Sequence, residues 1–374
     1  MNCYGRAMSL KDLTLIIPVF DRPNYLKRQV AYWSKHEVQI VIMDGSTTRA
    51  SDLVLQELTP RMRYFHSKMG FNQRLVEAST HIKTLYTVLL HDDEVYSVGG
   101  LSDCVRELET DSRLVGCQGR SMFFFHRDGQ IFAHETYENA SNLPNLFEDG
   151  LTRLRSSFIS GDPSHSPYVL YAVFRSDIWK KLIVMSYGIL YSSGYVYELA
   201  AQIAGNYLGP IKLIDSLVWF RSGENPAQTS ISLNRKIAMG EWGTDPRFSN
   251  EKSLFIGRAV ELMNSAGSNS VAEIDTAVRK TLQDFIEYSL HKPKRLKAKW
   301  HQILYFLNSV TPKLIKQVLK RNMTPTIGKL LDYRGRSMSE ALLLMESRGV
   351  KFDSSEMKEL EKFLLDFHRE LGLN

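Results

Sequence analysis

The sequence predicts an α/β fold with a buried parallel sheet, followed by a helical C-terminal part. Three observations support this: the first expected strands are largely apolar, short segments with helical signals separate them, and helix-start signals dominate after about residue 250. Strands buried on both faces form continuous apolar runs, and intervening helices are typical of βαβ units. We expect one domain over residues 1–250 and a helical domain over residues 251–374.

The first expected elements alternate strictly between strand and helix, in the order 13–17, 23–35, 39–43, 52–58, 63–65, 72–83 and 85–90. Pro23 suits the first position of a helix, where its missing N–H is no loss. The elements expected next are a helix at 100–109, strands at 114–118 and 168–174, helices at 177–182 and 197–204, and a strand at 211–220. Beyond residue 250, Ser270-x-x-Glu273, Ser337-x-x-Glu340 and Asp353-x-x-Glu356 resemble capping boxes.

Basic charge is concentrated in one segment. Residues 292–321 contain nine Lys or Arg and no Asp or Glu, whereas the rest of the chain has 38 basic and 41 acidic residues. This argues against nucleic-acid binding over the whole surface. No apolar run approaches the roughly 18 residues of a membrane span, and we recognise no secretory signal. Cys3, Cys104 and Cys117 lack metal-site or redox-pair spacing, which suits a reducing compartment.

Three adjacent acids, Asp92, Asp93 and Glu94, follow the strand expected at 85–90. Ligands bind beyond the carboxyl ends of parallel strands. Carboxylates buried together repel unless a cation neutralises them, and hard oxygen ligands suit Mg²⁺ or Mn²⁺ that bridges to substrate phosphates. We therefore expect a metal site here; the alternative is an acidic turn that caps the next helix.

A second acid, Asp44, follows the strand at 39–43 in the sequence Asp44-Gly45-Ser46. An acid in this place can bind a ribose hydroxyl or a base, although alone it also suits a tight turn. Neither the dinucleotide fingerprint nor the P-loop sequence is present. Arg221 follows a strand and would bind diphosphate oxygens, or it lies in a solvated loop.

Together these residues resemble a known family. The segments LIIPVFDRPNYLKR (15–28), VIMDGS (41–46) and TVLLHDDE (87–94) are similar to family 2-like glycosyltransferases with the GT-A fold, and in particular to a bacterial D-D-D-type subgroup associated with surface polysaccharide synthesis. The resemblance covers residues 10–120 well and 120–225 loosely. This chain departs from the pattern where Glu94 replaces an Asp and where Gly45 follows Asp44 in place of a second acid.

The resemblance implies specific site residues. The residues expected to bind the donor are Pro18, Phe20, Arg22, Asp44, Ser46, Arg74, Asp92 and Arg221, and those expected to bind Mn²⁺ or Mg²⁺ are Asp92, Asp93 and Glu94. The family has a catalytic base at the start of a helix in the second half, where this chain places Glu198. A helix-start carboxylate stabilised by the dipole is the other reading of Glu198, and Asp162 is the alternative acid.

The implied function is metal-dependent transfer of a sugar from a nucleoside-diphosphate donor, UDP-linked, to a saccharide or lipid-linked saccharide, with inversion expected from the family. A nucleotidyltransferase and a non-catalytic saccharide-binding protein on the same fold remain alternatives. We expect a cytoplasmic protein that docks on the inner face of the membrane through the amphipathic basic segment 292–321. The alternative is a helix that packs on the catalytic domain. No nucleic-acid partner is expected.

Overall fold

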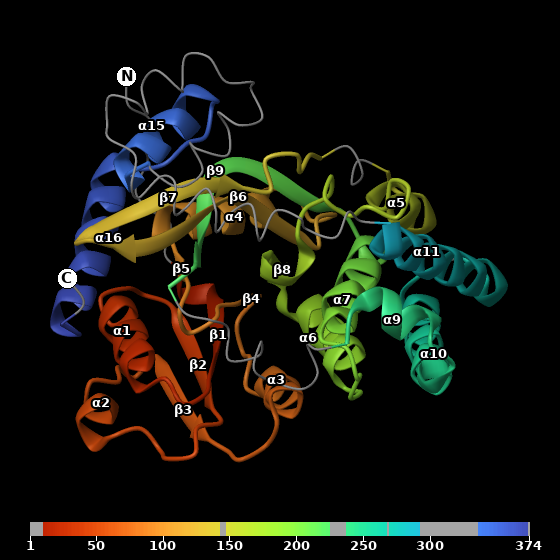
Figure 1. Ribbon diagram of the computed structural model, residues 1–374, viewed down its shortest axis with the longest axis horizontal. Helices are drawn as coiled ribbons and strands as arrows, with labels where there is room; N and C mark the ends of the chain where they lie inside the picture. The colour runs from red at the N-terminus through yellow and green to blue at the C-terminus, as the bar shows by residue number, and fades with distance from the viewer. Residues whose placement is uncertain (1–9, 143–146, 225–236, 268, 292–335, 373–374) are drawn as a thin grey trace, which may run out of the picture.

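The computed structural model describes residues 10–142, 147–224, 237–267, 269–291 and 336–372. Within them one mixed sheet of nine strands runs in the order β3-β2-β1-β4-β8-β6-β9-β5, with β7 paired to β6 (Figure 1). Its strands are β1 (Leu13–Val19), β2 (Gln39–Asp44), β3 (Met62–His66), β4 (Tyr86–Leu89), β5 (Val95–Tyr96), β6 (Gly116–Arg127), β7 (Gln130–Thr136), β8 (Val173–Arg175) and β9 (Ile211–Ser222). The predicted α/β class is confirmed.

The N-terminal half of the sheet is parallel, as the apolar strands predict. β1 pairs in parallel with β2 and β4, and β2 pairs in parallel with β3. All seven residues of β1 are buried. The register places Val19 beside Asp44, so the carboxyl ends of β1 and β2 meet at the same edge. Helices α1 (Pro23–Trp33), α2 (Asp52–Gln56) and α3 (Phe71–Thr80) connect these strands.

The other half of the sheet contains both parallel and antiparallel strand pairs. β8 pairs antiparallel with both β4 and β6, β9 runs parallel to β6, and β5 pairs antiparallel with β9. The strand predicted at 168–174 is instead a 3-10 turn over Val169–Tyr171 followed by the short β8. Its apolar run is buried under the neighbouring helices as well as in the sheet, which periodicity alone cannot distinguish.

Four helices surround the mixed half of the sheet: α4 (Val98–Thr110), α5 (Gly150–Ser157), α6 (Ser176–Tyr187) and α7 (Tyr195–Leu208). Of these, α4, α6 and α7 are longer than predicted, and α5 was not predicted. The centre of α7 is buried on all sides, since the side chains of Ala200, Ala201, Ile203 and Ala204 are completely buried. A helix without a polar face belongs to a core, and α7 therefore holds its first turn rigidly against the sheet.

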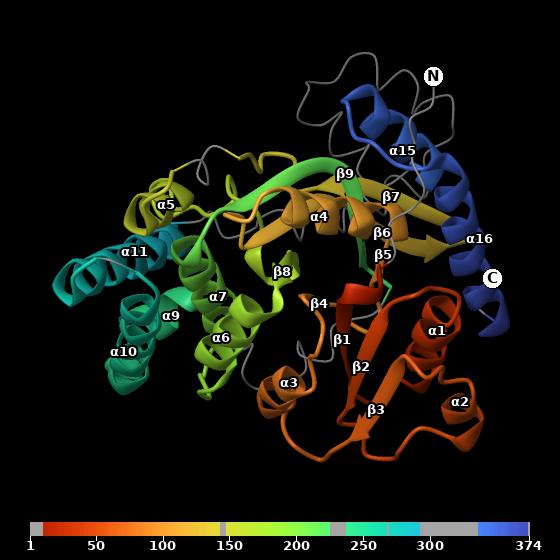
Figure 2. The same cartoon turned by 180° about the vertical axis from the view of Figure 1, so that it is seen from behind.

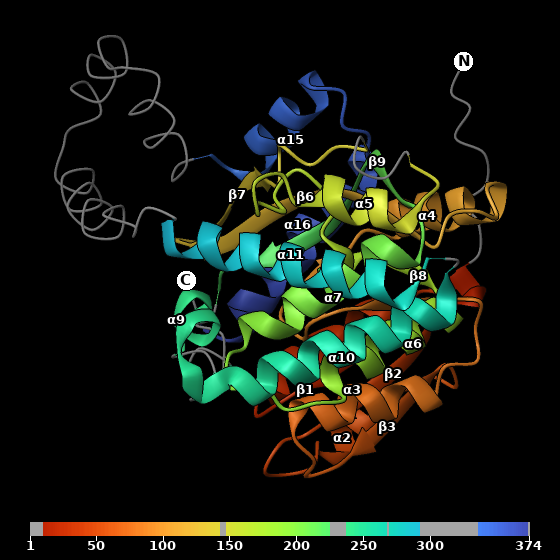
Figure 3. The same cartoon turned by 90° about the vertical axis from the view of Figure 1, so that its right-hand side faces the viewer.

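The part beyond residue 250 is helical where it is described, as predicted, but its helices pack at two separate places. α10 (Ser249–Ala266) and α11 (Val271–His291) lie with the short α9 (Met239–Thr244) against α5 and α7 (Figure 3). α15 (Met338–Ser347) and α16 (Ser354–Glu370) lie at the opposite end of the molecule, beside β7 (Figures 1 and 2). Both groups contribute to one continuous core with the sheet.

The basic segment 292–321 lies outside the described residues. None of the helices that the structure describes is long and apolar enough to cross a membrane. Cys104 and Cys117 are buried free thiols.

Candidate active site

A cleft of about 420 Å³ opens beyond the carboxyl ends of β1 and β4. One wall comes from the loop after β1, a second from the start of α3, a third from the turn after β4, and the last from α6, α7 and the segment between them. The lining residues include Pro18, Phe20, Arg22, Arg74, Asp92, Asp93 and Glu198 from the predicted site, together with Phe71, His91, Tyr171, Tyr187, Leu190 and Tyr197. The structure thus brings together acids and bases as far apart in the sequence as Arg22 and Glu198.

The acidic segment after β4 is a tight turn whose backbone is held by α1. The amide of Glu94 donates to the carbonyl of His91, and Gln29 Nε2 donates to the carbonyls of Asp92 (2.8 Å) and Glu94 (2.7 Å). Arg28 Nη2 donates to the carbonyl of Asp93. Because three successive carbonyls are fixed by α1, the side chains of Asp92 and Asp93 are directed into the cleft.

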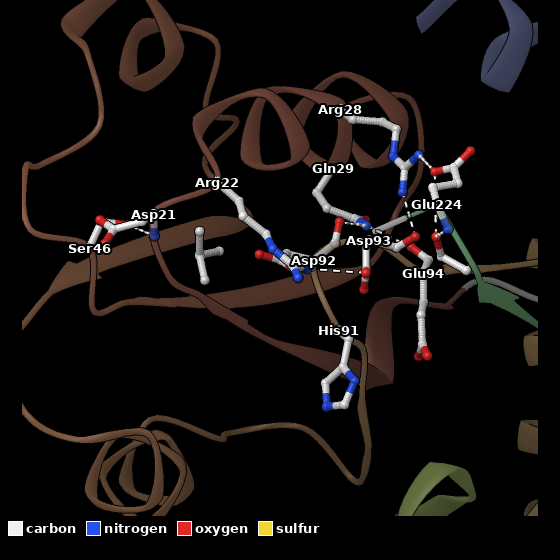
Figure 4. Close-up of polar contacts among 12 residues, drawn as sticks. Asp21, Arg22, Arg28, Gln29, Ser46, His91, Asp92, Asp93, Glu94 and Glu224 are labelled. Carbon is white, nitrogen blue, oxygen red and sulfur yellow. Dashed lines mark hydrogen bonds and ion pairs between the residues drawn. The ribbon is translucent and has the colours of Figure 1, made fainter. Parts of the chain in front are cut away.

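Arg22 lies between the two acids of this turn (Figure 4). Its Nη1 is 2.9 Å from Asp92 Oδ1 and 3.1 Å from Asp93 Oδ2, and all three side chains are largely buried. Burial, then the neighbouring charge of Asp93, raises the pKa of Asp92 to about 7 despite Arg22. Two carboxylate oxygens therefore converge on one position that a cation occupies, and here the cation is a guanidinium.

The third acid of the turn faces elsewhere. Glu94 Oε2 accepts a hydrogen bond from Trp219 Nε1 on β9 at 2.8 Å, and its side chain points away from Asp92 and Asp93 in Figure 4. Complete burial raises the pKa of Glu94 well above its usual range. The structure does not bring Glu94 to the converging pair, because Trp219 on β9 holds its carboxylate in the buried interior.

The residues fit a metal that takes few protein ligands. No group of three His, Cys, Asp or Glu side chains is arranged to hold a metal within the residues described. Asp92 and Asp93 alone offer two converging oxygens, and Mg²⁺ usually binds one or two carboxylates together with substrate phosphates and water. The donor set is therefore sufficient for Mg²⁺ or Mn²⁺ only when a phosphate completes it.

Asp44 lies at the end of β2 and is almost completely buried. Its Oδ1 accepts from the amide of Ser46 at 2.8 Å, and its Oδ2 accepts from the Tyr64 hydroxyl. Ser46 in turn accepts from the amide of Asp21 through its hydroxyl. Both predicted donor residues thus brace the loop after β1, and neither lines the cleft.

Arg74 lines the cleft but is engaged with the backbone. Its Nη1 donates to the carbonyls of Val19 (2.7 Å) and Met43, and its Nε donates to Met69. The guanidinium passes so close to Gly45 that a Cβ at that position would lie 2.3 Å from Arg74 Cζ. Arg74 therefore ties the carboxyl ends of β1 and β2 together, and Gly45 leaves the space for it.

The two candidate bases are placed differently. Glu198, in the first turn of α7, lines the cleft and accepts a hydrogen bond from the Tyr168 hydroxyl at 2.6 Å. Asp162 accepts from the amide of Ser164 in a turn and does not line the cleft. Arg221 is exposed on β9, donates to the Tyr137 hydroxyl, and also lies outside the cleft lining.

Sequence reasoning missed the aromatic wall opposite the acids. Tyr171 hydrogen-bonds His91 at 3.2 Å, Phe71 contacts Tyr187 edge-on, and the rings of Tyr187 and Tyr197 stack at 5.1 Å. These residues come from separate elements, and no local spacing connects them. The apolar run containing Tyr171 was the single available signal, and it was assigned to a strand.

Comparison with protein families matches residues 14–163 to the model described as glycosyl transferase family 2. Among solved structures, S. aureus TarS 1-349 in complex with UDP-GlcNAc is 12% identical, covers 87% of this chain and 90% of that chain, and has a TM-score of 0.45. A second structure, S. aureus TarS 1-349, is 11% identical with coverages of 77% and 93% and a TM-score of 0.39. Comparison with curated proteins gives no match. Structural likenesses this distant do not bear on substrate or mechanism.

Proposed function

Residues 14–163 belong to glycosyl transferase family 2, and from this premise we propose a metal-dependent transfer of a sugar from a UDP-linked donor. The acceptor is a saccharide or lipid-linked saccharide of a surface polysaccharide. The observation that supports metal dependence is the convergence of Asp92 Oδ1 and Asp93 Oδ2 on one cationic position inside the cleft. The UDP moiety and the acceptor class rest on the resemblance of residues 15–28, 41–46 and 87–94 to the family.

Asp92 and Asp93 would hold Mn²⁺ or Mg²⁺, which when bound supplies positive charge at the leaving diphosphate. Arg22 is the nearest basic group to these acids in the cleft. A guanidinium released from the acids can pair with diphosphate oxygens in bidentate fashion. In this proposal the metal ion binds Asp92 and Asp93, and Arg22 binds the diphosphate.

Glu198 is the acid placed for proton transfer. Its carboxylate takes the proton from the acceptor hydroxyl as that oxygen bonds to the anomeric carbon, and the bond from this carbon to the diphosphate oxygen breaks. The Tyr168 hydroxyl donates to Glu198 Oε2 at 2.6 Å, and this hydrogen bond orients the carboxylate. Such an attack opposite the leaving group inverts the anomeric centre, as the family resemblance implies.

The test is release of the nucleoside diphosphate from a panel of sugar nucleotides, with and without Mn²⁺. We expect one donor to be hydrolysed or transferred in the presence of metal, and Asp93→Asn to lose this activity while its circular dichroism is unchanged. Asp128→Asn is the matched control, because Asp128 is exposed in the β6–β7 turn. Full metal-dependent activity in Asp93→Asn would rule out the metal assignment.

The same panel separates the alternative activities. A nucleotidyltransferase would release pyrophosphate from a nucleoside triphosphate, and a saccharide-binding protein would bind sugars without turnover. Either result, with no release of nucleoside diphosphate from any donor, would replace the transferase proposal.

Docking on an anionic membrane face is a separate proposal, supported by the nine basic and no acidic residues of segment 292–321 and by its Trp300, Tyr305 and Phe306. Each Lys or Arg near anionic lipid contributes about 1 kcal/mol. The protein is expected to sediment with anionic but not neutral liposomes at low salt. Binding should disappear when Lys294, Arg295, Lys297 and Lys299 are changed to Gln, and equal, negligible binding to both liposomes would exclude docking.

A further inference from the structure

The C-terminal helix α16 is linked to the acidic turn indirectly at two places. One link runs through Glu224 and Arg28 to the carbonyl of Asp93. The other reaches the start of α4, which follows the turn and β5 in the chain. The two contacts come from opposite ends of the helix, namely Glu356 in its first turn and His368 in its last.

The first contact runs through buried charges. Arg28, which holds the carbonyl of Asp93, also donates from Nη1 to Glu224 Oε2 at 3.0 Å. Glu224 Oε1 is hydrogen-bonded to Nε2 of His368. The side chains of Arg28, Glu224 and His368 are all at most 3% exposed. A buried charge is stable only when it is paired, so the three side chains are held as one unit.

Aromatic rings enclose this unit. The Arg28 guanidinium lies 4.6 Å from the ring centroid of Tyr25 and 4.8 Å from that of Phe367, the neighbour of His368 on α16. The His368 ring stacks on His126 of β6 at 4.2 Å. Burial alone would raise the pKa of Glu224, but the hydrogen bond from His368 and the charge of Arg28 hold it below its ordinary value. The carboxylate therefore stays charged and keeps Arg28 in place.

The second contact caps α4. The carboxylate of Glu356 accepts hydrogen bonds from the amides of Val98 and Gly99, the first two residues of α4. A carboxylate at a helix N-terminus stabilises the helix through its free amides and its dipole. A Cβ at Gly99 would lie 2.9 Å from Glu356 Oε2, so the glycine permits this close approach.

We propose that α16 is a positioning element of the active site, which fixes the Asp92–Asp93 turn through the Arg28–Glu224–His368 unit on one side and through Glu356 on the other. The catalytic part of this proposal rests on the proposed function. The mechanical part does not, because it concerns the backbone of residues 91–99 alone. Groups that orient metal-binding or catalytic acids typically change metal affinity or activity by about 10- to 100-fold when they are removed.

The experiment compares the full-length variants His368→Gln and Glu356→Gln with the wild type by hydrogen–deuterium exchange and by donor turnover. Glu370→Gln is the control, since Glu370 lies on the same helix and pairs with Lys27 on the exposed surface at 3.4 Å. We expect faster exchange in peptides covering 91–101 in both variants, unchanged exchange in β3, and kcat/KM lower by about 10-fold or more. The control should match the wild type in every measurement.

Three outcomes would overturn the proposal: unchanged exchange at 91–101, faster exchange throughout the sheet, which would make α16 a general stabiliser, or local loosening with unchanged turnover. If His368→Gln does not fold, Glu356→Gln decides the question, because Glu356 is less buried than His368. Gln keeps the side-chain size but loses the negative charge and one of the two oxygens that accept from Val98 and Gly99. Failure of the proposed function is distinguishable from failure of the mechanical proposal. If the wild type has no transferase activity, the two variants should still exchange faster than the wild type at residues 91–101.

Discussion

Replacing Arg22 with Ala is expected to strengthen donor-free binding of Mn²⁺. The guanidinium occupies the position on which the two carboxylate oxygens converge, at 2.9 and 3.1 Å. With an effective dielectric constant of about 20, each contact at this distance corresponds to about 5 kcal/mol of Coulomb attraction. Much of this attraction is offset because the guanidinium and the carboxylates lose hydration when they pair. The net interaction energy measured for close charge pairs starts at about 1.5 kcal/mol. Because about 1.4 kcal/mol is a factor of ten, Mn²⁺ should bind at least about tenfold more tightly once Arg22 is removed.

The assay is calorimetric titration of Mn²⁺ into the protein without donor. It is run at several pH values from about pH 8 upward, because the pKa of Asp92, about 7 beside Arg22, rises further when Arg22 is removed and proton release then lowers the apparent metal affinity of the variant. Arg49→Ala is the matched control, because Arg49 forms an exposed contact with Asp52 at 3.5 Å. Equal or weaker Mn²⁺ binding by folded Arg22→Ala would refute the view that Arg22 and the metal compete for one position.

Three further outcomes are expected. Glu198→Gln should lower single-turnover rates by about 100-fold or more while calorimetric donor affinity is unchanged, since a base acts only in the chemical step; normal turnover would exclude Glu198. Asp44→Ala should weaken donor affinity by about 10-fold or more with a smaller effect on kcat, because the Ser46 amide loses its acceptor and Ser46 holds the loop after β1, which supplies Phe20 and Arg22 to the cleft before and during reaction; a fall confined to kcat would contradict this. Gly45→Ala should lower the free energy of urea unfolding by about 1–3 kcal/mol, since its Cβ would overlap Arg74; unchanged stability would show that Arg74 can move freely.

Local patterns were sufficient to predict the parallel half of the sheet and the positions of the acids. The apolar runs of β2 and β4 are each followed by polar residues, so Asp44 and Asp92 could be assigned to strand ends from the sequence alone. The direction in which each side chain points could not be predicted from local patterns. Glu94 turns toward Trp219, which is 125 positions away, and no local signal records that partner.

The partners of the acids were also beyond sequence reasoning. Arg22 was expected to bind donor, but its contact with Asp92 spans 70 positions and depends on how the loop after β1 folds back. The contacts of Arg74 with the backbone carbonyls of Val19 and Met43 are likewise distant in sequence and could not be predicted from it. For the helices after residue 250, capping patterns predicted their starts at Ser337 and Asp353 but not their surroundings, because an amphipathic face does not identify the surface that covers it.

The pairing of α1 with α16 has a consequence for synthesis of the chain. Arg28 leaves the ribosome about 340 residues before His368, which at about 5–20 residues per second is an interval of roughly 20 to 70 seconds. The βα units around β1 to β4 have mostly local contacts and can form early, whereas the Arg28 side chain that holds the carbonyl of Asp93 gains its indirect link to α16 only when α16 docks. A nascent chain that has not yet reached α16 therefore holds its acidic turn through the α1 residues Arg28 and Gln29 alone, without the bracing of Arg28 by Glu224 and His368.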